Sequence, residues 1–449
     1  MLTVEENERL TRVGAGTPMG ELMRRYWIPI RPYAQLLEED VLPVRVLGED
    51  LVLFRSTKGE MGLVGDRCPH RLAQLQLGIP DEGGLRCCYH GWLFSPTGQC
   101  VDMPLEAPES TFKDRIKIKG YPVRELGGLI WAYLGPEPAP LLPPWDLLVF
   151  PNAIRQIGVT DLNCNWLQCQ ENTGDPTHNV YLHGYLFKYV LEKQGKLDER
   201  AADEMMHTFY GRTKMAIGIE SLYAHQTQYG MEKGINYSKA LGADRDYSSR
   251  HSTVIFPFFT QTGGPDRVRQ EFQIRVPVDD THTYHINYGC FLAPEGVEVE
   301  EQDIIPWYQV PLYDEKGKPI LDFVLAQDLH VWLSQGEVSD RTQEHLGRTD
   351  TPIILMRQQF EEQIRTVEDG GDPINVFRDP RSIPELLHGG VWPEDADLGS
   401  GRRRQFVSYR SAYHRGYSLD DADRYGPALP QIMDLMSRIE EFANARSDY

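Results

Sequence analysis

The 449-residue sequence has no long hydrophobic run and no excess of basic charge. No stretch approaches the ~20 apolar residues of a membrane-spanning helix, so we expect no membrane span. Asp and Glu number 66 against 46 Lys and Arg, which gives a formal net charge of −20. This balance argues against nucleic acid and anionic membranes as partners, because both would repel the chain. The hydrophobic fraction of 41% excludes wholesale disorder and suits a globular chain of more than one domain.

Cysteine is also scarce. The chain has seven, and four of them (Cys68, Cys87, Cys88 and Cys100) lie in one short segment. An odd, modest number suits metal binding in a reducing compartment better than a disulfide framework. The first residues, MLTVEENERLTRVG, have neither the basic region nor the apolar core of a signal peptide. We therefore expect a cytoplasmic protein.

Changes of pattern along the chain predict two domains. Residues 17–28 begin with Thr-Pro and place apolar side chains at helical spacing, which predicts a short helix. Short β-rich runs separated by glycines follow from Val41 to about Leu134 and predict a small antiparallel β domain around the cysteine cluster. Five prolines in residues 136–146 then mark a boundary. We assign residues 1–145 to the first domain and residues 146–449 to a second, with helices near 165–195, 321–367 and 430–445 and strands between about 205 and 292.

The cysteine cluster contains a metal-binding pattern. Cys68, His70, Cys87 and His90 form Cys-x-His-x16-Cys-x2-His. Two pairs of thiol and imidazole groups on two loops could surround a tetrahedral zinc or a two-iron cluster. Each loop supplies one Cys and one His, which favours the iron–sulfur cluster, since zinc fingers usually take two Cys from one element. A structural zinc site is the alternative, and Cys88 is expected to bind no metal.

A second possible metal site lies in residues 171–184, ENTGDPTHNVYLHG, where Asp175, His178 and His183 form Asp-x2-His-x4-His. On an ideal α-helix, five residues turn by about 500°, which leaves the two imidazoles roughly 140° apart. They can share a metal only if the helix is unwound or bulged between them, a distortion that often marks functional sites. Two histidines and one carboxylate on one face of Fe(II) leave positions open for dioxygen.

The carboxylate ligand is expected in residues 321–355, where three aspartates are candidates. Asp328 has Val or Trp at i−4, i+3 and i+4, so it lies on an apolar helix face, where an unpaired carboxylate is costly. Asp340 has polar neighbours, and Asp350 precedes Thr-Pro, where a helix N-cap is expected. We predict Asp328. The alternative is a buried aspartate paired with a basic side chain.

The letters around these residues resemble a known family. CPHR and CYHGW resemble the Rieske proteins, and together with the second motif the chain resembles the catalytic α subunit of Rieske non-haem iron aromatic-ring-hydroxylating oxygenases. Respiratory-chain Rieske proteins join the two loops by a disulfide, but Ala73 and Tyr89 stand at those positions. Residues 335–347, QGEVSDRTQEHLG, resemble the phthalate dioxygenase group. The family's ligand aspartate aligns with Asp328, although Leu333 stands where the family usually has Glu.

The resemblance implies a fold, cofactors and ligands. It implies an α+β chain, in which an N-terminal all-β Rieske [2Fe–2S] domain precedes a helix-grip catalytic domain, an antiparallel sheet around a long helix. It also implies O2 as co-substrate and a mononuclear Fe(II). Asp175 takes the position of an aspartate that bridges a cluster histidine of one chain and an iron ligand of the next in a head-to-tail trimer. The implied cluster ligands are Cys68, His70, Cys87 and His90, and the implied iron ligands are His178, His183 and Asp328.

The electron source is expected to be another protein. Residues 14–20 are glycine-rich, but no strand precedes them and Pro18 interrupts them, so they do not predict a nicotinamide site. The resemblance implies a separate flavin and iron–sulfur reductase that takes electrons from NAD(P)H. It also implies a homotrimer or a stacked hexamer.

The resemblance implies an aromatic acid or a related phenolic ether as substrate. We expect dihydroxylation of a phthalate- or benzoate-like acid, with O-demethylation or monooxygenation of a methoxylated or substituted aromatic acid as the alternative. Arg250, which shares strand parity with Ser252, is the first candidate anchor for the substrate carboxylate, and Arg212 is the second. The alternative for both is that they only balance surplus acidic residues. From another class, a Rieske electron carrier without oxygenase activity predicts no second iron.

Overall fold

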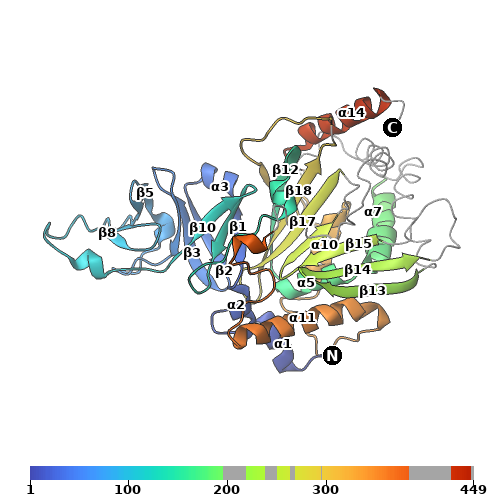
Figure 1. Ribbon diagram of the computed structural model, residues 1–449, viewed down its shortest axis with the longest axis horizontal. Coiled ribbons are helices and arrows are strands. Elements are labelled where there is room, and N and C mark those ends of the chain that lie inside the picture. Colours follow the sequence, from blue (N-terminus) through green and yellow to red (C-terminus); the bar gives the residue numbers. More distant parts are fainter. Residues whose placement is uncertain (196–218, 238–249, 263–267, 295, 384–425, 446–449) are drawn as a thin grey trace.

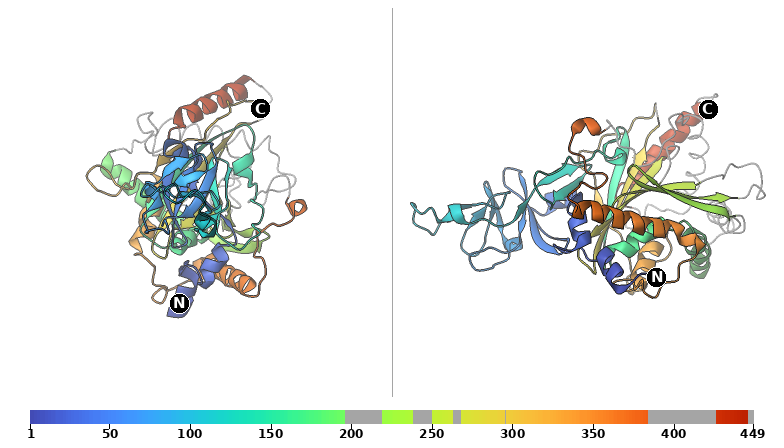
Figure 2. Two further views of the ribbon diagram at one scale, coloured as in Figure 1. Left: turned by 90° about the vertical axis from the view of Figure 1, so that its left-hand side faces the viewer. Right: turned by 60° about the horizontal axis from the view of Figure 1, so that its bottom comes forward.

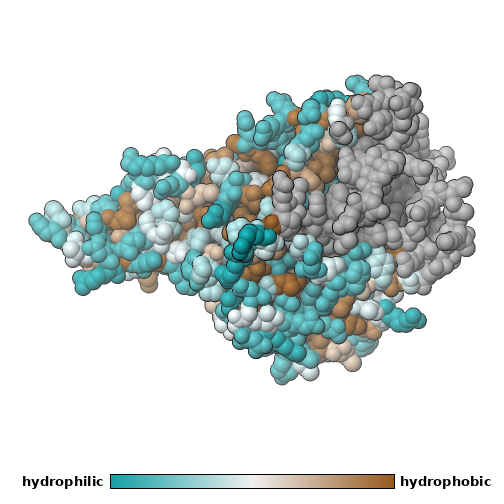
Figure 3. All heavy atoms as spheres, in the orientation of Figure 1, coloured by the Kyte–Doolittle hydropathy of each residue, from teal (hydrophilic) through white to brown (hydrophobic). Residues whose placement is uncertain are grey.

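The computed structural model describes residues 1–195, 219–237, 250–262, 268–294, 296–383 and 426–445. They form an elongated molecule with a smaller β lobe and a larger lobe of sheet and helices, at the left and right of Figure 1. This is the expected α+β arrangement. The face in Figure 3 is mainly hydrophilic over the smaller lobe, with scattered hydrophobic side chains. No helix in the described ranges is long and apolar enough to cross a membrane.

The smaller lobe contains three antiparallel sheets. Its strand β2 shows how the sequence forms them, since Leu42, Val44 and Val46 are buried while Pro43 and Arg45 are exposed. Such alternation places one face of a sheet on a core. The sheets confirm the antiparallel β region expected around the cysteine cluster. Their orders are β1-β11-β10 (Trp27–Pro32, Leu129–Tyr133, Val123–Leu126), β2-β3-β4-β9 (Val41–Val46, Glu49–Arg55, Met61–Gly65, Gly120–Tyr121) and β5-β6-β7-β8 (Ile79–Asp81, Gly84–Arg86, Leu93–Phe94, Cys100–Asp102).

An eight-stranded sheet forms the centre of the larger lobe. Neighbouring strands are antiparallel except β12 and β19, which pair in parallel. Strand β18 is buried along nearly its whole length, because both faces of the sheet are covered. The order is β13 (Ile219–Thr227), β14 (Gly230–Tyr237), β15 (Arg250–Ile255), β16 (Phe259–Thr262), β17 (Arg269–Pro277), β18 (Thr283–Leu292), β12 (Ala153–Leu162) and β19 (Trp307–Gln309).

The two faces of this sheet have different neighbours. Trp131 of β11 stacks on Phe259 with ring centroids 6.1 Å apart, so the smaller lobe covers part of one face. On the other face, α5 (Trp166–Gly174) and α10 (Val324–Ser334) contact the sheet through Thr173 and Trp332. The long helix α11 (Thr351–Glu368) packs against β13 and α5, and α14 (Leu429–Ala445) packs near Ile154. Shorter α-helices of the described ranges include α3 (Tyr33–Glu38), α4 (Asp146–Val149), α6 (His178–Val180) and α7 (Phe187–Gln194).

The N-terminal helices α1 (Val4–Thr11) and α2 (Pro18–Met23) lie beside α11, as the right-hand view of Figure 2 shows in dark blue and orange. Arg9 of α1 binds Glu361 at 3.0 Å and Glu368 at 2.9 Å. The N-terminal residues thus pack on the C-terminal part of the chain. The division of the chain at residue 145 stays a prediction.

The predicted helix over residues 17–28 is too long. It begins as expected, with the Thr17 side chain accepting a hydrogen bond from the Gly20 amide, but it ends at Met23. Trp27 instead begins strand β1, which pairs with β11. Pro29 explains part of the difference, since the residue before a proline is disfavoured in helical conformation.

Candidate metal centres

Two tight loops of the smaller lobe present the first motif. Cys68 follows β4, and its amide donates to the carbonyl of Ala73 at 2.9 Å. Cys87 follows β6, and its amide donates to the carbonyl of Trp92 at 2.8 Å. Each cysteine is therefore fixed at the base of a closed loop.

In this motif the two histidines lie side by side, and the two cysteines are neighbours. Cys68 and Cys87 are buried, whereas His70 is exposed and His90 is half-buried. The two imidazole rings are 4.5 Å apart, and Trp92 stacks on His70 at 4.6 Å. Thiols inside and imidazoles outside suit a Rieske cluster, in which two thiolates hold one iron and two imidazoles hold the other.

Two features of these loops fit a bound cluster. Burial raises the pKa of the Cys68 thiol to about 11, and the neighbouring Cys87 acts in the same direction. Iron would offset this cost, because a coordinating thiol is deprotonated by its metal. The Nδ1 atom of His90 is buried and has no hydrogen-bond partner. Cys88 is exposed, and the Cys100 thiol lies 3.5 Å from the carbonyl of Asp102.

The second motif lies on a distorted helix. His178 begins α6, and His183 lies in a π-helical segment, Tyr181–Leu186. Hydrogen bonds in a π-helix join residues i and i+5, and such segments are frequent at functional sites. The two imidazole rings are 5.1 Å apart. The distortion that a shared metal requires is therefore present.

Asp328 of α10 completes the second group. Its Oδ1 atom lies 3.2 Å from His183 Nε2 and 3.6 Å from His178 Nε2. The three ligand atoms lie within 4.8 Å of one another, and no other set of three His, Cys, Asp or Glu residues in the described ranges does so. Asp340 is exposed and accepts hydrogen bonds from Thr342. The structure thus brings Asp328 to the histidines.

The charge of Asp328 is stabilised although the side chain is only 5% exposed. Burial alone would raise the pKa of this carboxyl, but His183, His178 and Arg275 hold it below its ordinary value. Asn172 donates a hydrogen bond to Oδ1 at 3.3 Å. Two imidazoles and one carboxylate are a donor set suited to Fe(II).

Gln327 orients His183, and sequence reasoning missed it. Its Oε1 atom lies 2.9 Å from His183 Nδ1, and its amide nitrogen donates to the carbonyl of Leu321 at 2.8 Å. A proton on Nδ1 leaves the Nε2 lone pair directed toward Asp328 and available to a metal. The sequence contains one signal for this role, because Gln327 stands directly before Asp328 in a mainly apolar helix.

Asp175 caps the end of α5 and lies next to His178. Its Oδ1 atom accepts from the amide and hydroxyl of Thr177 at 2.6 and 2.7 Å, and its Oδ2 atom lies 3.6 Å from His178 Nδ1. Burial would raise the pKa of this carboxyl, but His178 and Thr177 hold it well below its usual range. Asp175 therefore stabilises the turn at the end of α5 and also contacts the imidazole of His178.

The two arginine candidates are not placed by the structure. Arg250 begins strand β15, but its side chain lies outside the described residues. Arg212 falls in residues 196–218, which also lie outside the description.

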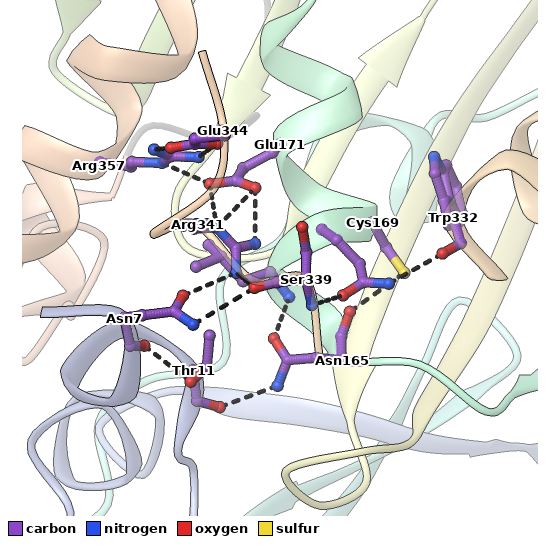
Figure 4. Close-up of polar contacts among 12 residues, drawn as sticks. Asn7, Thr11, Asn165, Cys169, Glu171, Trp332, Ser339, Arg341, Glu344 and Arg357 are labelled. Atoms are coloured by element: carbon purple, nitrogen blue, oxygen red, sulfur yellow. Dashed lines mark hydrogen bonds and ion pairs between the residues drawn. The ribbon is translucent and has the colours of Figure 1, made fainter. Parts of the chain in front are cut away.

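A buried ionic network holds α5 against residues 335–347 (Figure 4). Glu171 of α5 accepts from Arg341 Nη2 and from Arg357 Nε, both at 2.6 Å. Arg341 also donates to Asn7 at 3.1 Å, and Arg357 also pairs with Glu344. The segment that resembles the phthalate dioxygenase group thus has a defined contact.

A second contact joins α5 to the end of α10. The Gln168 amide nitrogen donates to the carbonyls of Trp332 and Gly336, both at 2.9 Å. Because Asp175 and the two histidines follow α5 while Asp328 lies in α10, these contacts fix the distance between the candidate ligands.

Comparison with known proteins decides the family. A Rieske [2Fe–2S] domain family matches residues 26–122, and a LigXa C-terminal domain-like family matches residues 320–394. The 5,5'-dehydrodivanillate O-demethylase oxygenase subunit of Sphingobium sp. (strain NBRC 103272 / SYK-6) is 38% identical, over 89% of this chain and 91% of that protein. This chain belongs to the Rieske non-haem iron oxygenases, as an oxygenase subunit.

More distant relatives support the same family. The 3-chlorobenzoate-3,4-dioxygenase oxygenase subunit of Comamonas testosteroni is 32% identical, over 85% of this chain and 94% of that protein. The phthalate 4,5-dioxygenase oxygenase subunit of Pseudomonas putida is 29% identical, over 86% and 91%. The terminal oxygenase of carbazole 1,9a-dioxygenase from Nocardioides aromaticivorans IC177 superposes with a TM-score of 0.55 at 18% identity, over 80% and 97% of the two chains. At this identity the superposition shows the fold alone.

The family membership confirms several expectations from the sequence. This Rieske oxygenase is an oxidoreductase that acts with O2. Its cofactors are a Rieske [2Fe–2S] cluster and a mononuclear iron, and NAD(P)H supplies the electrons through a separate reductase, as in the family. The individual ligands stay predictions that the geometry supports.

Replacing Glu171 by Gln should destabilise the protein, because Arg341 and Arg357 lose their buried counter-charge. We expect the free energy of unfolding at pH 7 to fall by about 3–5 kcal/mol, measured by urea denaturation. The two arginines hold the pKa of Glu171 below its ordinary value of 4.5, although burial opposes them. This carboxylate therefore stabilises the fold above pH 4.5, and the difference in the free energy of unfolding between the two proteins should narrow as the pH falls below that value. The control is the more exposed ion pair between Arg9 and Glu368. Glu368→Gln should lower the free energy of unfolding by less than about 1 kcal/mol.

Replacing Gln327 by Leu should weaken iron binding, because His183 loses the acceptor that fixes its tautomer. We expect the affinity for the mononuclear iron to fall about 10–100-fold, measured as iron retained during dialysis against a chelator. The absorbance of the Rieske cluster serves as an internal reference, and Gln343→Leu is the matched surface control. If Gln327→Leu retains as much iron as the wild type, Gln327 does not orient His183 for metal binding.

Proposed function

We propose that this Rieske oxygenase O-demethylates a methoxylated aromatic acid. The observation that carries the proposal is its 38% identity, along nearly the whole of both chains, to a protein named as an O-demethylase oxygenase subunit. The LigXa C-terminal domain-like match also spans the part of the chain that contains Asp328. For this reason we favour O-demethylation, the alternative reaction expected from the sequence, over ring dihydroxylation.

In this proposal the two groups of side chains have separate tasks. His178, His183 and Asp328 hold Fe(II), which supplies O2 activation when it is bound. Two imidazoles and one carboxylate would leave coordination positions of such an iron open to O2. Overall, the methyl ether, O2, two electrons and two protons give a phenol, formaldehyde and water. The proposed cluster ligands are Cys68, His70, Cys87 and His90.

Ring dihydroxylation is the second candidate function. Relatives named as 3-chlorobenzoate and phthalate dioxygenase subunits match most of this chain. Both reactions would use the same iron and the same electrons. Which substrate atom the protein holds nearest the iron decides between them.

We also propose that electrons pass between subunits of a head-to-tail trimer. The cluster loops and the candidate iron ligands lie in different lobes of one chain (Figure 1). The cluster loops expose Leu72 and Tyr89, and the helical segment of the iron ligands exposes Tyr181, Tyr185 and Tyr189. Two such exposed apolar surfaces favour an interface. Asp175 lies beside His178 and is the candidate bridge to the next subunit.

Replacing Asp175 by Asn tests the bridge. Asn keeps an oxygen acceptor for Thr177 but loses the negative charge beside His178. We expect turnover to fall about 100-fold while the contents of both iron centres stay at the wild-type level. Metal analysis, cluster absorbance and steady-state turnover with the electron partner measure this, and Asp161→Asn, an exposed strand residue, is the control. Normal turnover in Asp175→Asn would exclude the bridge.

A single-turnover experiment tests the reaction. The cluster- and iron-loaded protein is reduced without oxygen, mixed with benzoate, phthalate or methoxybenzoates, and then exposed to O2. Mass spectrometry should show a methoxybenzoate that has lost CH2, together with formaldehyde. A product that has gained two oxygens and two hydrogens would establish dihydroxylation instead. If both metals are present and no acid is altered, the proposed substrate class is wrong.

A further inference from the structure

The larger lobe contains a buried cation that the iron site does not use. Lys233 of β14 is only 5% exposed. Within the described part of the chain, its ammonium group has no hydrogen bond or ion pair. Lysine is almost never fully buried without a partner, because removing an unpaired charge from water is costly. Lys233 therefore requires an explanation.

The register of the sheet shows which face Lys233 occupies. Residues paired directly opposite one another point to the same face, and alternate residues along a strand do so too. Lys233 pairs with Ser252, and successive pairings and alternations lead to Thr260, Arg275 and His285. Lys233 thus shares one face of the sheet with these three residues.

That face is covered by α10, which carries Asp328, and by α5, which leads into Asp175 and His178. The Thr260 hydroxyl donates to Thr173 of α5 at 2.8 Å. The ring of His285 lies 5.5 Å from Trp332 of α10. Lys233 therefore lies on the wall of the sheet that faces the iron site.

The charged groups around Lys233 agree with its placement on the wall that faces the iron site. Burial lowers the pKa of the ammonium group to about 8. The carboxylates of Asp175 and Asp328 oppose this shift, and Arg275 adds to it. The group is therefore largely protonated at neutral pH. Arg275, a second buried cation, donates to Thr260 and to Gln273, which are neutral. This face thus presents two cations, Lys233 and Arg275. In the described ranges, neither has a direct hydrogen bond to a carboxylate.

Several polar atoms on the same wall also lack a partner. Both ring nitrogens of His285, the Nε atom of Arg275 and the Oδ1 atom of Asn287 are buried without a hydrogen bond. The Trp332 indole nitrogen on α10 is in the same state. Buried polar atoms are normally paired, so such a group indicates a place for water or a polar ligand.

We propose that Lys233 binds the carboxylate of the aromatic substrate and so directs its ring toward the iron. The proposal rests on the proposed function and extends it, because it assigns the acid group a partner. A charge-assisted hydrogen bond between ammonium and carboxylate is strong where water is excluded. Lys233 is thus a specificity residue. From the sequence, only Arg250 and Arg212 are expected in this role.

Binding to matched acids and amides tests the proposal. The reduced, oxygen-free protein with both metals is titrated calorimetrically with benzoate, 3-methoxybenzoate and vanillate, and with the corresponding uncharged amides. Lys233→Met keeps a similar length without the charge. We expect it to weaken binding of the acids about 10–100-fold and that of the amides less than about twofold.

The controls separate binding from folding. Lys318→Met removes an exposed lysine and should leave all affinities unchanged, and Lys233→Arg should restore part of the preference for acids. Cluster absorbance and circular dichroism check that each variant is folded. Equal weakening of acids and amides in Lys233→Met would overturn the proposal. So would a wild-type protein that does not bind the acids more tightly than the amides.

The outcome is distinguishable from a failure of the proposed reaction. Loss of acid binding in Lys233→Met, together with a ring diol as the wild-type product, would support the anchor and overturn demethylation. Formation of phenol and formaldehyde equally well from acid and amide would support demethylation and overturn the anchor.

Discussion

The buried contact of Glu171 with Arg341 and Arg357 is the constraint on which the candidate iron site depends (Figure 4). A carboxylate in the interior is tolerated only when its charge is paired, and removing one partner leaves the others uncompensated. Here the pairing joins α5 to residues 335–347 and to α11. The helix that leads into Asp175 and His178 therefore cannot shift without separating buried charges.

The iron site itself combines a distorted helix with a buried acid. The π-helical turn brings His183 next to His178, and α10 places Asp328 against both. Two of these side chains are further held by a neighbour, His183 by Gln327 and Asp328 by Asn172. Such outer contacts fix tautomer and orientation, so the ligands are arranged before a metal binds.

The wall opposite these ligands gives the site its expected selectivity. In an acidic chain, this wall of the sheet contains two buried cations, Lys233 and Arg275. An aromatic acid is suited to this region, since its ring needs an apolar cavity and its charge needs a partner. The same iron could then demethylate or dihydroxylate, depending on which atom the anchor brings near it.

The sequence by itself indicated the metal chemistry, because candidate ligands such as Cys68 and His70 lie close together along the chain in fixed spacings. It also selected Asp328, since an aspartate on an apolar helix face needs a compensating partner. The tertiary structure decided what depends on distant contacts. The π-turn, the orientation of His183 by Gln327 and the unpaired Lys233 depend on packing between separate elements, and no local pattern records which faces meet.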